Sequence, residues 1–413
     1  MKVFAMGGAG LFGLPSSRLL TASDLVTKIV IAGRNIERAQ QAATELGDKA
    51  SAVQVDANDV ERLASLLAGY DLLVDTAPGK VLLSAVRAAI GAKTHYCNLD
   101  APLQVLRFDA EARAAGIIVS VGNGALPGLT NLMAVHAASQ LDQVEVIHVS
   151  WPRVGPRLDS VLAVLSDPQE RLAALRELGY AKRTLQRVQK LQRRSNVRET
   201  IPIYQDGQWM DVDPFERGVQ VTPPQGGVVT AYPILSSMNY YGLHTLRRHL
   251  PGVRTVGLEF SRFPPPLDEL FREQVRRVAL GEIGPEKAAN SFYKAIAADP
   301  DRWLVGPEVF ASLLAIPAVW TTAVVTAFGR KGGRAARYAC WATSWGLTHI
   351  TAPGVVAALK ILRGEIEERG VLPPEACFEP QPFFGEVARL LSEPPPDGKL
   401  VGESFAWLDS HSG

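Results

Sequence analysis

The chain is poor in cysteine and in net charge. Its 413 residues include three cysteines, which lie far apart and form no C-x-x-C pair. This excludes a disulfide framework and a cysteine-based zinc site, so we expect no metal and a reducing compartment. The formal net charge of +1 gives no field that would draw nucleic acid or an anionic membrane. Neither is an expected partner, and the length suits two domains.

Long uncharged runs are also scarce. Residues 309–329 carry no charge and are long enough to cross a bilayer. Pro317 interrupts them, however, and residues 321–328 look like a strand. With residues 334–342 beyond a glycine-rich turn, they predict a β-hairpin and no membrane partner. A strand-like segment, residues 2–6, opens the sequence without a signal segment before it, so we expect a cytoplasmic protein.

A glycine-rich turn follows that first strand-like segment directly. Gly8, Gly10 and Gly13 have the G-x-G-x-x-G spacing, and residues 14–20 look like the start of a helix. A strand, this turn and a helix together are typical of a dinucleotide site, in which backbone N–H groups and the helix N-terminus face a pyrophosphate. The predicted contacts with the cofactor here are Gly7, Gly8, Gly10, Leu11, Phe12 and Gly13.

Strand and helix patterns alternate through residues 1–125. This alternation predicts a Rossmann-type α/β domain with a doubly wound parallel sheet. Its further strands are expected at 28–32, 52–56, 71–75, 94–97 and 117–121, and its helices at 35–46, 59–67 and 81–90. Beyond it the pattern becomes richer in strands, at 144–151, 218–222 and 254–260, with helices at 267–280 and 351–363. Residues 181–198 form a basic helix-like stretch, either a solvated surface or a docking surface.

The end of the second strand indicates which dinucleotide is bound. NAD-binding folds place an acidic residue there for the ribose hydroxyl, whereas this chain has Arg34 and Asn35. A guanidinium suits a 2′-phosphate, so we predict NADP(H) as the cofactor. Asp56 and Ala57, after the third strand, are expected near the adenine. Thr76, Ala77 and Pro78, after the fourth, are expected beside the nicotinamide ribose.

Several motifs occur together in a fixed order along the chain. They are residues 7–13, 32–35, 71–79, 95–96, 127–131, 351–355, 370–375 and 382–384. In this order the chain resembles the saccharopine dehydrogenase-like family, namely its reductases that form saccharopine and carboxynorspermidine. The resemblance implies an α+β substrate and dimerisation domain (126–345) inserted between residues 1–125 and a returning C-terminal part (346–413). It also implies a homodimer in which NADPH reduces an imine.

Three departures from the family pattern concern the substrate. Leu126 stands where saccharopine-forming reductases resemble one another in an acidic residue before Pro-Gly. Residues 151–156 replace their Gly-Gly-Leu-Pro run, and residues 239–244 lack the acidic residue of many relatives. The resemblance therefore implies the fold and the reaction type, with a product other than saccharopine.

Candidate catalytic residues are expected at the carboxyl end of the predicted strand at 94–97, the edge of the sheet where a ligand binds. His95 or Tyr96 would donate a proton, and Asp100 would hold an amine. The alternatives are core packing for Tyr96 and a backbone hydrogen bond for His95. A protonated imine already carries the charge that accepts hydride, so positioning could supply most of the catalysis.

Candidate substrate residues lie in three further segments. Asn123, Gly124 and Pro127 precede a helix whose N-terminus would hold a substrate carboxylate, or they only direct that helix. Arg153 would clamp a carboxylate or lie at the surface. Tyr240, Tyr241 and His244 would line a substrate pocket or simply pack.

The sequence favours an NADPH-dependent reductase that acts on an imine and gives a secondary amine or N-substituted amino acid. The expected partner is a small, carboxylate-bearing substrate. Two alternatives remain open: reduction of a C=C or C=O bond on the same scaffold, and a non-catalytic NADP-binding protein that regulates or binds a partner.

Overall fold

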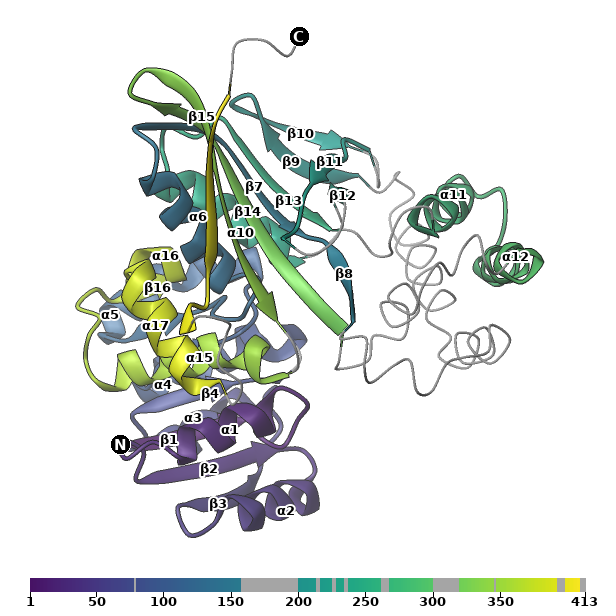
Figure 1. Ribbon diagram of the computed structural model, residues 1–413. Coiled ribbons are helices and arrows are strands. Elements are labelled where there is room, and N and C mark those ends of the chain that lie inside the picture. Colours follow the sequence, from purple (N-terminus) through teal and green to yellow (C-terminus); the bar gives the residue numbers. More distant parts are fainter. Residues whose placement is uncertain are drawn as a thin grey trace. The chain divides into compact units, whose positions relative to one another are not determined.

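The computed structural model describes residues 1–77, 79–156, 200–212, 216–224, 228–233, 237–260, 267–299, 319–344, 347–391 and 398–408. The chain divides into two compact units (Figure 1). Unit 1 consists of Met1–Gln143, Ser236–Gly252 and Leu347–Gly402, and unit 2 of Val144–Leu235, Val253–Gly346 and Glu403–Gly413. Three separate stretches of sequence thus build unit 1.

Unit 1 contains a seven-stranded sheet in which every pairing is parallel. Its order is β16-β6-β5-β4-β1-β2-β3, which is the Rossmann order with β16 added at one edge. The strands are β1 (Lys2–Met6), β2 (Lys28–Gly33), β3 (Ala50–Gln54), β4 (Leu72–Asp75), β5 (His95–Asn98), β6 (Ile118–Ser120) and β16 (Gly370–Leu372). The predicted doubly wound parallel sheet is confirmed.

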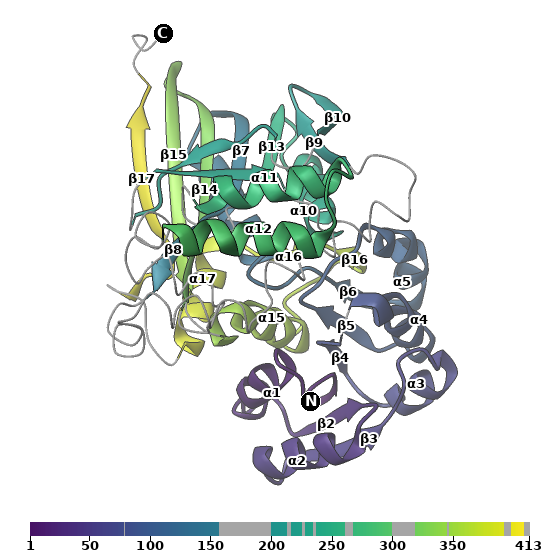
Figure 2. The same ribbon diagram turned by 90° about the vertical axis from the view of Figure 1, so that its right-hand side faces the viewer.

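Helices cover both faces of this sheet (Figure 2). One face carries α1 (Gly13–Thr21), α2 (Ile36–Leu46) and α15 (Leu347–Leu362), and the other carries α3 (Val60–Leu67), α4 (Leu82–Ala92) and α5 (Asp109–Ala115). Side chains set two of these helix starts: Asn35 Oδ1 accepts from Arg38 N at 2.9 Å and Asp59 Oδ1 accepts from Arg62 N at 3.0 Å. Such caps satisfy N–H groups that lack a partner in the helix.

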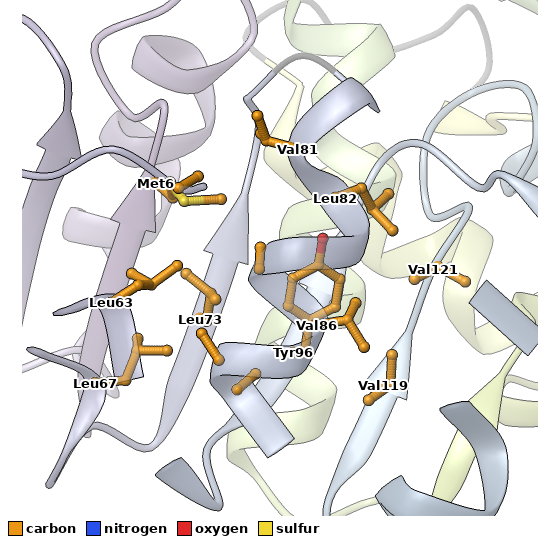
Figure 3. Packing of buried hydrophobic residues seen from close by; sticks show 14 of the residues in the cluster. Met6, Leu63, Leu67, Leu73, Val81, Leu82, Val86, Tyr96, Val119 and Val121 are labelled. Atoms are coloured by element: carbon orange, nitrogen blue, oxygen red, sulfur yellow. The ribbon is translucent and has the colours of Figure 1, made fainter. Parts of the chain in front are cut away.

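The main core of unit 1 lies under α3 and α4. Phe4 and Met6 of β1 point to this face, as alternate residues of a strand do. They pack with Leu63 and Leu67 of α3 and with Leu73 of β4. Figure 3 shows Met6 together with these three leucines. Each such side chain contributes about 1.5–3 kcal/mol when it is fully buried. The core therefore fixes β1 beside β4.

The remaining elements of unit 1 come from distant parts of the sequence. They are the short turns η1 (Gly79–Val81) and η2 (Leu103–Phe108), and the helices α6 (Leu129–Ser139), α10 (Ser237–His249), α16 (Pro374–Cys377) and α17 (Pro380–Leu390). Contacts join α6 to α10, α16 and α17. The chain thus returns twice to the region that follows β6.

Unit 2 is built on a second, mixed sheet of ten strands among the described residues. Its strands are β7 (Gln143–Trp151), β8 (Arg153–Pro156), β9 (Ile201–Gln205), β10 (Gln208–Val212), β11 (Val219–Val221), β12 (Val229–Pro233), β13 (Thr255–Phe260), β14 (Val319–Lys331), β15 (Arg334–Ser344) and β17 (Gly402–Trp407). β7 and β13 pair in parallel, whereas β14 and β15 form an antiparallel hairpin. Helices α11 (Leu267–Ala279) and α12 (Pro285–Ala298) pack on each other.

The hairpin predicted from residues 321–328 and 334–342 is confirmed as β14 and β15. No helix in the described part of the chain is long and apolar enough to cross a membrane. The helix predicted at 351–363 begins earlier, at Leu347. Pro353 favours a first-turn position, but it lies inside α15. The basic stretch 181–198 lies outside the described residues.

Candidate functional site

The predicted phosphate-binding turn lies between β1 and α1, at the carboxyl edge of the sheet. Gly7 N donates to Ala32 O at 2.8 Å, and Gly7 has a φ of +73°. A Cβ on Gly13 would lie 2.0 Å from Gly7 O and 2.7 Å from Thr76 Oγ1. Both positions therefore require glycine. Among the described residues no side chain caps the N-terminus of α1. Leu14 N already donates to Gly10 O, and Pro15 has no N–H, so the N–H of Gly13 is the one that the first three residues of α1 offer to an anion.

The turn after β4 is fastened to this glycine turn. Thr76 donates to Met6 O twice, from its backbone N at 2.9 Å and from Oγ1 at 3.1 Å. Ala77 N donates to Asp75 Oδ1 at 2.8 Å. The strand order reverses between β1 and β4, and ligands of open α/β sheets bind at such a point. Pro78 lies outside the described residues.

The residues predicted for the adenosine end follow β2 and β3. Arg34 is exposed, and Asn35 is exposed although its Oδ1 caps α2. Asp56 is exposed, and its Oδ1 accepts from Asn58, whereas Ala57 is buried. Arg38 is a second exposed arginine, in the first turn of α2. Arg38 was not among the predicted site residues, although its position four residues after Arg34 could have indicated a second phosphate-binding arginine.

A buried network of polar side chains lies at the ends of β4 and β5. Tyr96 Oη donates to Asp75 Oδ2 at 2.7 Å, and Asn98 Nδ2 donates to Tyr96 Oη at 2.9 Å. The Tyr96 ring lies within the core shown in Figure 3. Asp100 N donates to Asn98 Oδ1 at 2.5 Å. The network therefore joins Asp75 to the loop that carries Asp100. Asp75 and Asn98 were not among the predicted site residues.

Burial changes the acidity of these groups. Removal from water raises the pKa of Asp75 to about 7, against hydrogen bonds from Tyr96 and Ala77 that lower it. Burial also raises the pKa of Asp100. The pKa of Tyr96 rises well above its usual value because the ring is buried and Asp75 is adjacent. The edge of the sheet thus holds two carboxyl groups that bind protons more tightly than usual.

The predicted position of His95 is wrong. We expected it at the carboxyl end of its strand, but it opens β5 at the opposite edge of the sheet. Its Nδ1 accepts from Ile118 N at 3.0 Å, and burial together with Arg369 lowers its pKa. Of the three predicted catalytic residues, Tyr96 and Asp100 belong to the hydrogen-bond network at the ends of β4 and β5, and His95 does not.

The predicted carboxylate-binding segment lies after β6. Asn123 is buried, and its Nδ2 donates to Asn98 O at 3.2 Å. Gly124 and Pro127 are also buried. Beyond them, at the start of α6, Thr130 Oγ1 is buried and has no hydrogen-bond partner among the described residues. The N–H groups of Leu129, Thr130 and Asn131 already donate to backbone oxygens, so what this segment offers is the hydroxyl of Thr130.

Tyr241 of α10 approaches the same segment. Its ring atom Cε1 would lie 3.3 Å from a Cβ on Gly122, and its hydroxyl has no hydrogen-bond partner among the described residues. Burial is the main reason why the pKa of Tyr241 is raised, and the charge of Glu375 raises it further. His244 is half-buried, and its pKa is lowered mainly by burial and then by the positive charge of Arg248. The side chains of Arg153 and Tyr240 lie outside the described part of the structure.

A buried pair joins α6 to the C-terminal part of the chain. Asn131 Nδ2 donates to Glu375 Oε2 at 3.0 Å, across 244 positions of sequence. Burial raises the pKa of Glu375. The pair holds α16 against the helix that begins beside Thr130. No sequence pattern indicated this pair, because Asn131 and Glu375 are far apart in the sequence and belong to no common motif.

Comparisons with known proteins match this geometry. Residues 4–119 match the family model of the saccharopine dehydrogenase NADP-binding domain. This part of the chain is therefore similar to an NADP-binding domain of that family. The resemblance drawn from the sequence motifs is confirmed, and the saccharopine dehydrogenase-type domain supports an oxidoreductase with a nicotinamide cofactor.

Two solved structures resemble the whole chain. Saccharopine dehydrogenase (L-Glu forming) from Saccharomyces cerevisiae has a TM-score of 0.63 at 16% identity, covering 98% of this chain and 99% of that one. The homospermidine synthase of Legionella pneumophila, solved with NAD, has a TM-score of 0.57 at 13% identity, covering 100% and 93%. At these identities they show that the fold is shared.

The raised pKa of Asp75 gives a first prediction. A carboxyl group with a folded pKa near 7 stabilises the protein below its unfolded pKa, and that stability is lost as the pH rises through about 7. Between about pH 5 and pH 8 this amounts to about 3 kcal/mol of unfolding free energy. Urea unfolding should show that Asp75→Asn loses this pH dependence, whereas exposed Asp24→Asn keeps it. An unchanged slope in Asp75→Asn would refute the assignment.

Proposed function

We propose that this protein is an NADPH-dependent reductase of an imine formed between an amine and a carbonyl compound or 2-oxo acid. Its product would be a secondary amine or N-substituted amino acid other than saccharopine. The observation that carries this proposal is the pair of carboxyl groups, Asp75 and Asp100, joined through Tyr96 and Asn98 directly after β4 and β5. They lie beside the turn that follows β4, where the nicotinamide ribose is expected.

The residues of unit 1 fit a dinucleotide. The turn at residues 7–13 has the required glycines, and α1 has no side-chain cap, so its N-terminus can receive a pyrophosphate. Thr76 and Ala77 form the neighbouring wall. Bound NADPH supplies a hydride; the protein has to bind, orient and neutralise the acceptor.

The carboxyl groups suit a cationic acceptor. A protonated imine carries positive charge in its ground state, and a carboxylate close to it favours that protonated form. Asp100 is half-buried, and burial raises its pKa, so it binds a proton more tightly than an exposed aspartate does. Tyr96 Oη and Ala77 N hold Asp75 in place by donating to its two oxygens. These groups need not move during the reaction.

A substrate carboxylate is assigned to the start of α6. Thr130 Oγ1, buried and without a partner among the described residues, is the donor that supports this. The backbone N–H groups of the first turn of α6 donate to backbone oxygens, so the hydroxyl is the group that this helix start contributes. Homodimer formation and a cytoplasmic location remain predictions that accompany this proposal.

The chemistry is tested with a panel of amines and 2-oxo acids and with NADPH that carries deuterium at its transferable position. We expect oxidation of NADPH only when amine and carbonyl compound are both present, with deuterium on the carbon bonded to nitrogen. Asp100→Asn should lower kcat/KM by about 100-fold because the charge at the acceptor is lost, whereas Asp24→Asn should not. Reduction of the carbonyl compound alone, deuterium on a former C=C carbon, or tight NADPH binding without turnover would each contradict the proposal.

We further infer that NADP(H) is preferred over NAD(H). The support is Arg34, exposed after β2, with Arg38 exposed one turn later and no carboxylate at the end of that strand. Two guanidinium groups suit a 2′-phosphate. The homospermidine synthase of Legionella pneumophila was solved with NAD, so the affinities of this protein for NADPH and NADH have to be compared directly.

Arg34→Ala tests the preference. Loss of a charged hydrogen bond costs about 1.5–3 kcal/mol, so NADPH affinity should fall about 10- to 100-fold while NADH affinity changes little. Fluorescence titration of both cofactors measures this, with exposed Arg62→Ala of α3 as the matched control. Equal losses for NADPH and NADH would rule out contact with the 2′-phosphate.

A further inference from the structure

Unit 2 contains a pocket that includes none of the candidate site residues. Its volume is about 450 Å³, within the range of small-molecule sites. It is lined from β7, β9, β13 and the start of β11, strands that Figure 1 shows together in the second sheet. Its apolar lining includes Val146, Ile203, Val219 and Val256. The pocket therefore combines an apolar wall with the charged groups described next.

A buried ion pair forms part of the lining. His148 Nδ1 and Glu259 Oε1 are 2.7 Å apart, and Ser150 Oγ donates to Glu259 Oε2 at 3.2 Å. Glu259 is 2% exposed, so its two oxygens are satisfied inside the protein. A Cβ on Gly257 would lie 1.8 Å from Glu259 Oε1 and 2.6 Å from His148 Nδ1, so glycine leaves room for the pair.

The pair leaves one polar atom of His148 for another partner. Burial disfavours the charged ring, but the Glu259 carboxylate outweighs burial and raises the pKa of His148. The ring is thereby held with Nδ1 on Glu259, and its Nε2 has no hydrogen-bond partner among the described residues. Since the side chain is 21% exposed, a bound molecule can reach it.

A second pair of opposite charges lines the pocket. Gln205 Oε1 accepts from Arg217 Nη1 and Gln205 Nε2 donates to Asp206 Oδ2, each at 3.4 Å. One neutral amide thus links a guanidinium to a carboxylate, and both keep hydrogen-bonding capacity. Asp206 N also donates to Thr255 Oγ1. Arg217 has a left-handed backbone, with a φ of 55°, a conformation that is uncommon for residues other than glycine.

We propose that this pocket binds a free α-amino acid with an apolar side chain. Arg217 and His148 Nε2 are the donors for its carboxylate, and Asp206 is the acceptor for its ammonium group. The lining holds a guanidinium, an imidazole and two carboxyl groups, so a molecule with both a carboxylate and an ammonium group finds a partner for each. The apolar wall takes the side chain. This proposal does not depend on the proposed reaction.

Calorimetric titration of the full-length protein with L-leucine tests the ligand class. The matched probes are 3-methylbutylamine, which lacks the carboxylate, and 4-methylpentanoate, which lacks the ammonium group. We expect leucine to bind with a Kd of about 1 mM or tighter and each probe to bind at least about 10-fold more weakly. No heat from leucine at about 10 mM, or equal affinity for either probe, would overturn the proposal.

Variants test the location. Arg217→Gln and Asp206→Asn should each weaken leucine binding about 10-fold, whereas Arg254→Gln, at an exposed arginine outside the pocket lining, should not. Leucine should also shift the His148 C2–H proton resonance, one of seven from histidines in the chain and assigned by its absence in His148→Gln. If that variant does not fold, the other two decide the question. Unchanged affinity in both would overturn the proposal.

Discussion

The close contact between two turns, residues 7–13 and 76–77, is the constraint on which the cofactor half depends. Thr76 is tied to Met6 O by two hydrogen bonds, and Gly13 lies so near Gly7 O that no Cβ fits between them. The core under α3 and α4 holds β1 beside β4, and the strand order reverses at this junction. A crevice at the carboxyl edge follows from that reversal.

The polar groups of the candidate site belong to residues at the carboxyl ends of neighbouring strands. Asp75 and Asn98 are the last residues of β4 and β5, and Tyr96 reaches both from within the core. Because Asp75, Tyr96 and Asn98 are all buried, their polar groups satisfy one another instead of water. The cost of that burial appears as the raised pKa of Asp75. An acceptor with positive charge is stabilised by such a site.

Local patterns predicted β1 to β6 and the glycine turn, since each depends on neighbours in sequence. Long-range contacts were not predictable in this way: Asn131 pairs with Glu375, and α10 packs on α6, across more than a hundred positions. His95 was misplaced because it was assigned to the carboxyl end of a short strand that begins with it. Tyr96 was identified, but its partner Asp75 was read only as the end of a strand.

The central claim is that the contact between the two turns forms a nicotinamide dinucleotide site. Its most direct test is fluorescence titration of NADPH into Gly13→Ala, compared with Gly91→Ala. A Cβ at Gly91 of α4 meets its nearest atom at an ordinary 3.9 Å, so that substitution controls for the added methyl group. The account predicts at least about 100-fold weaker NADPH binding in Gly13→Ala, a loss of about 2.7 kcal/mol, with near-native affinity in Gly91→Ala. Equal affinities in the two variants would contradict it.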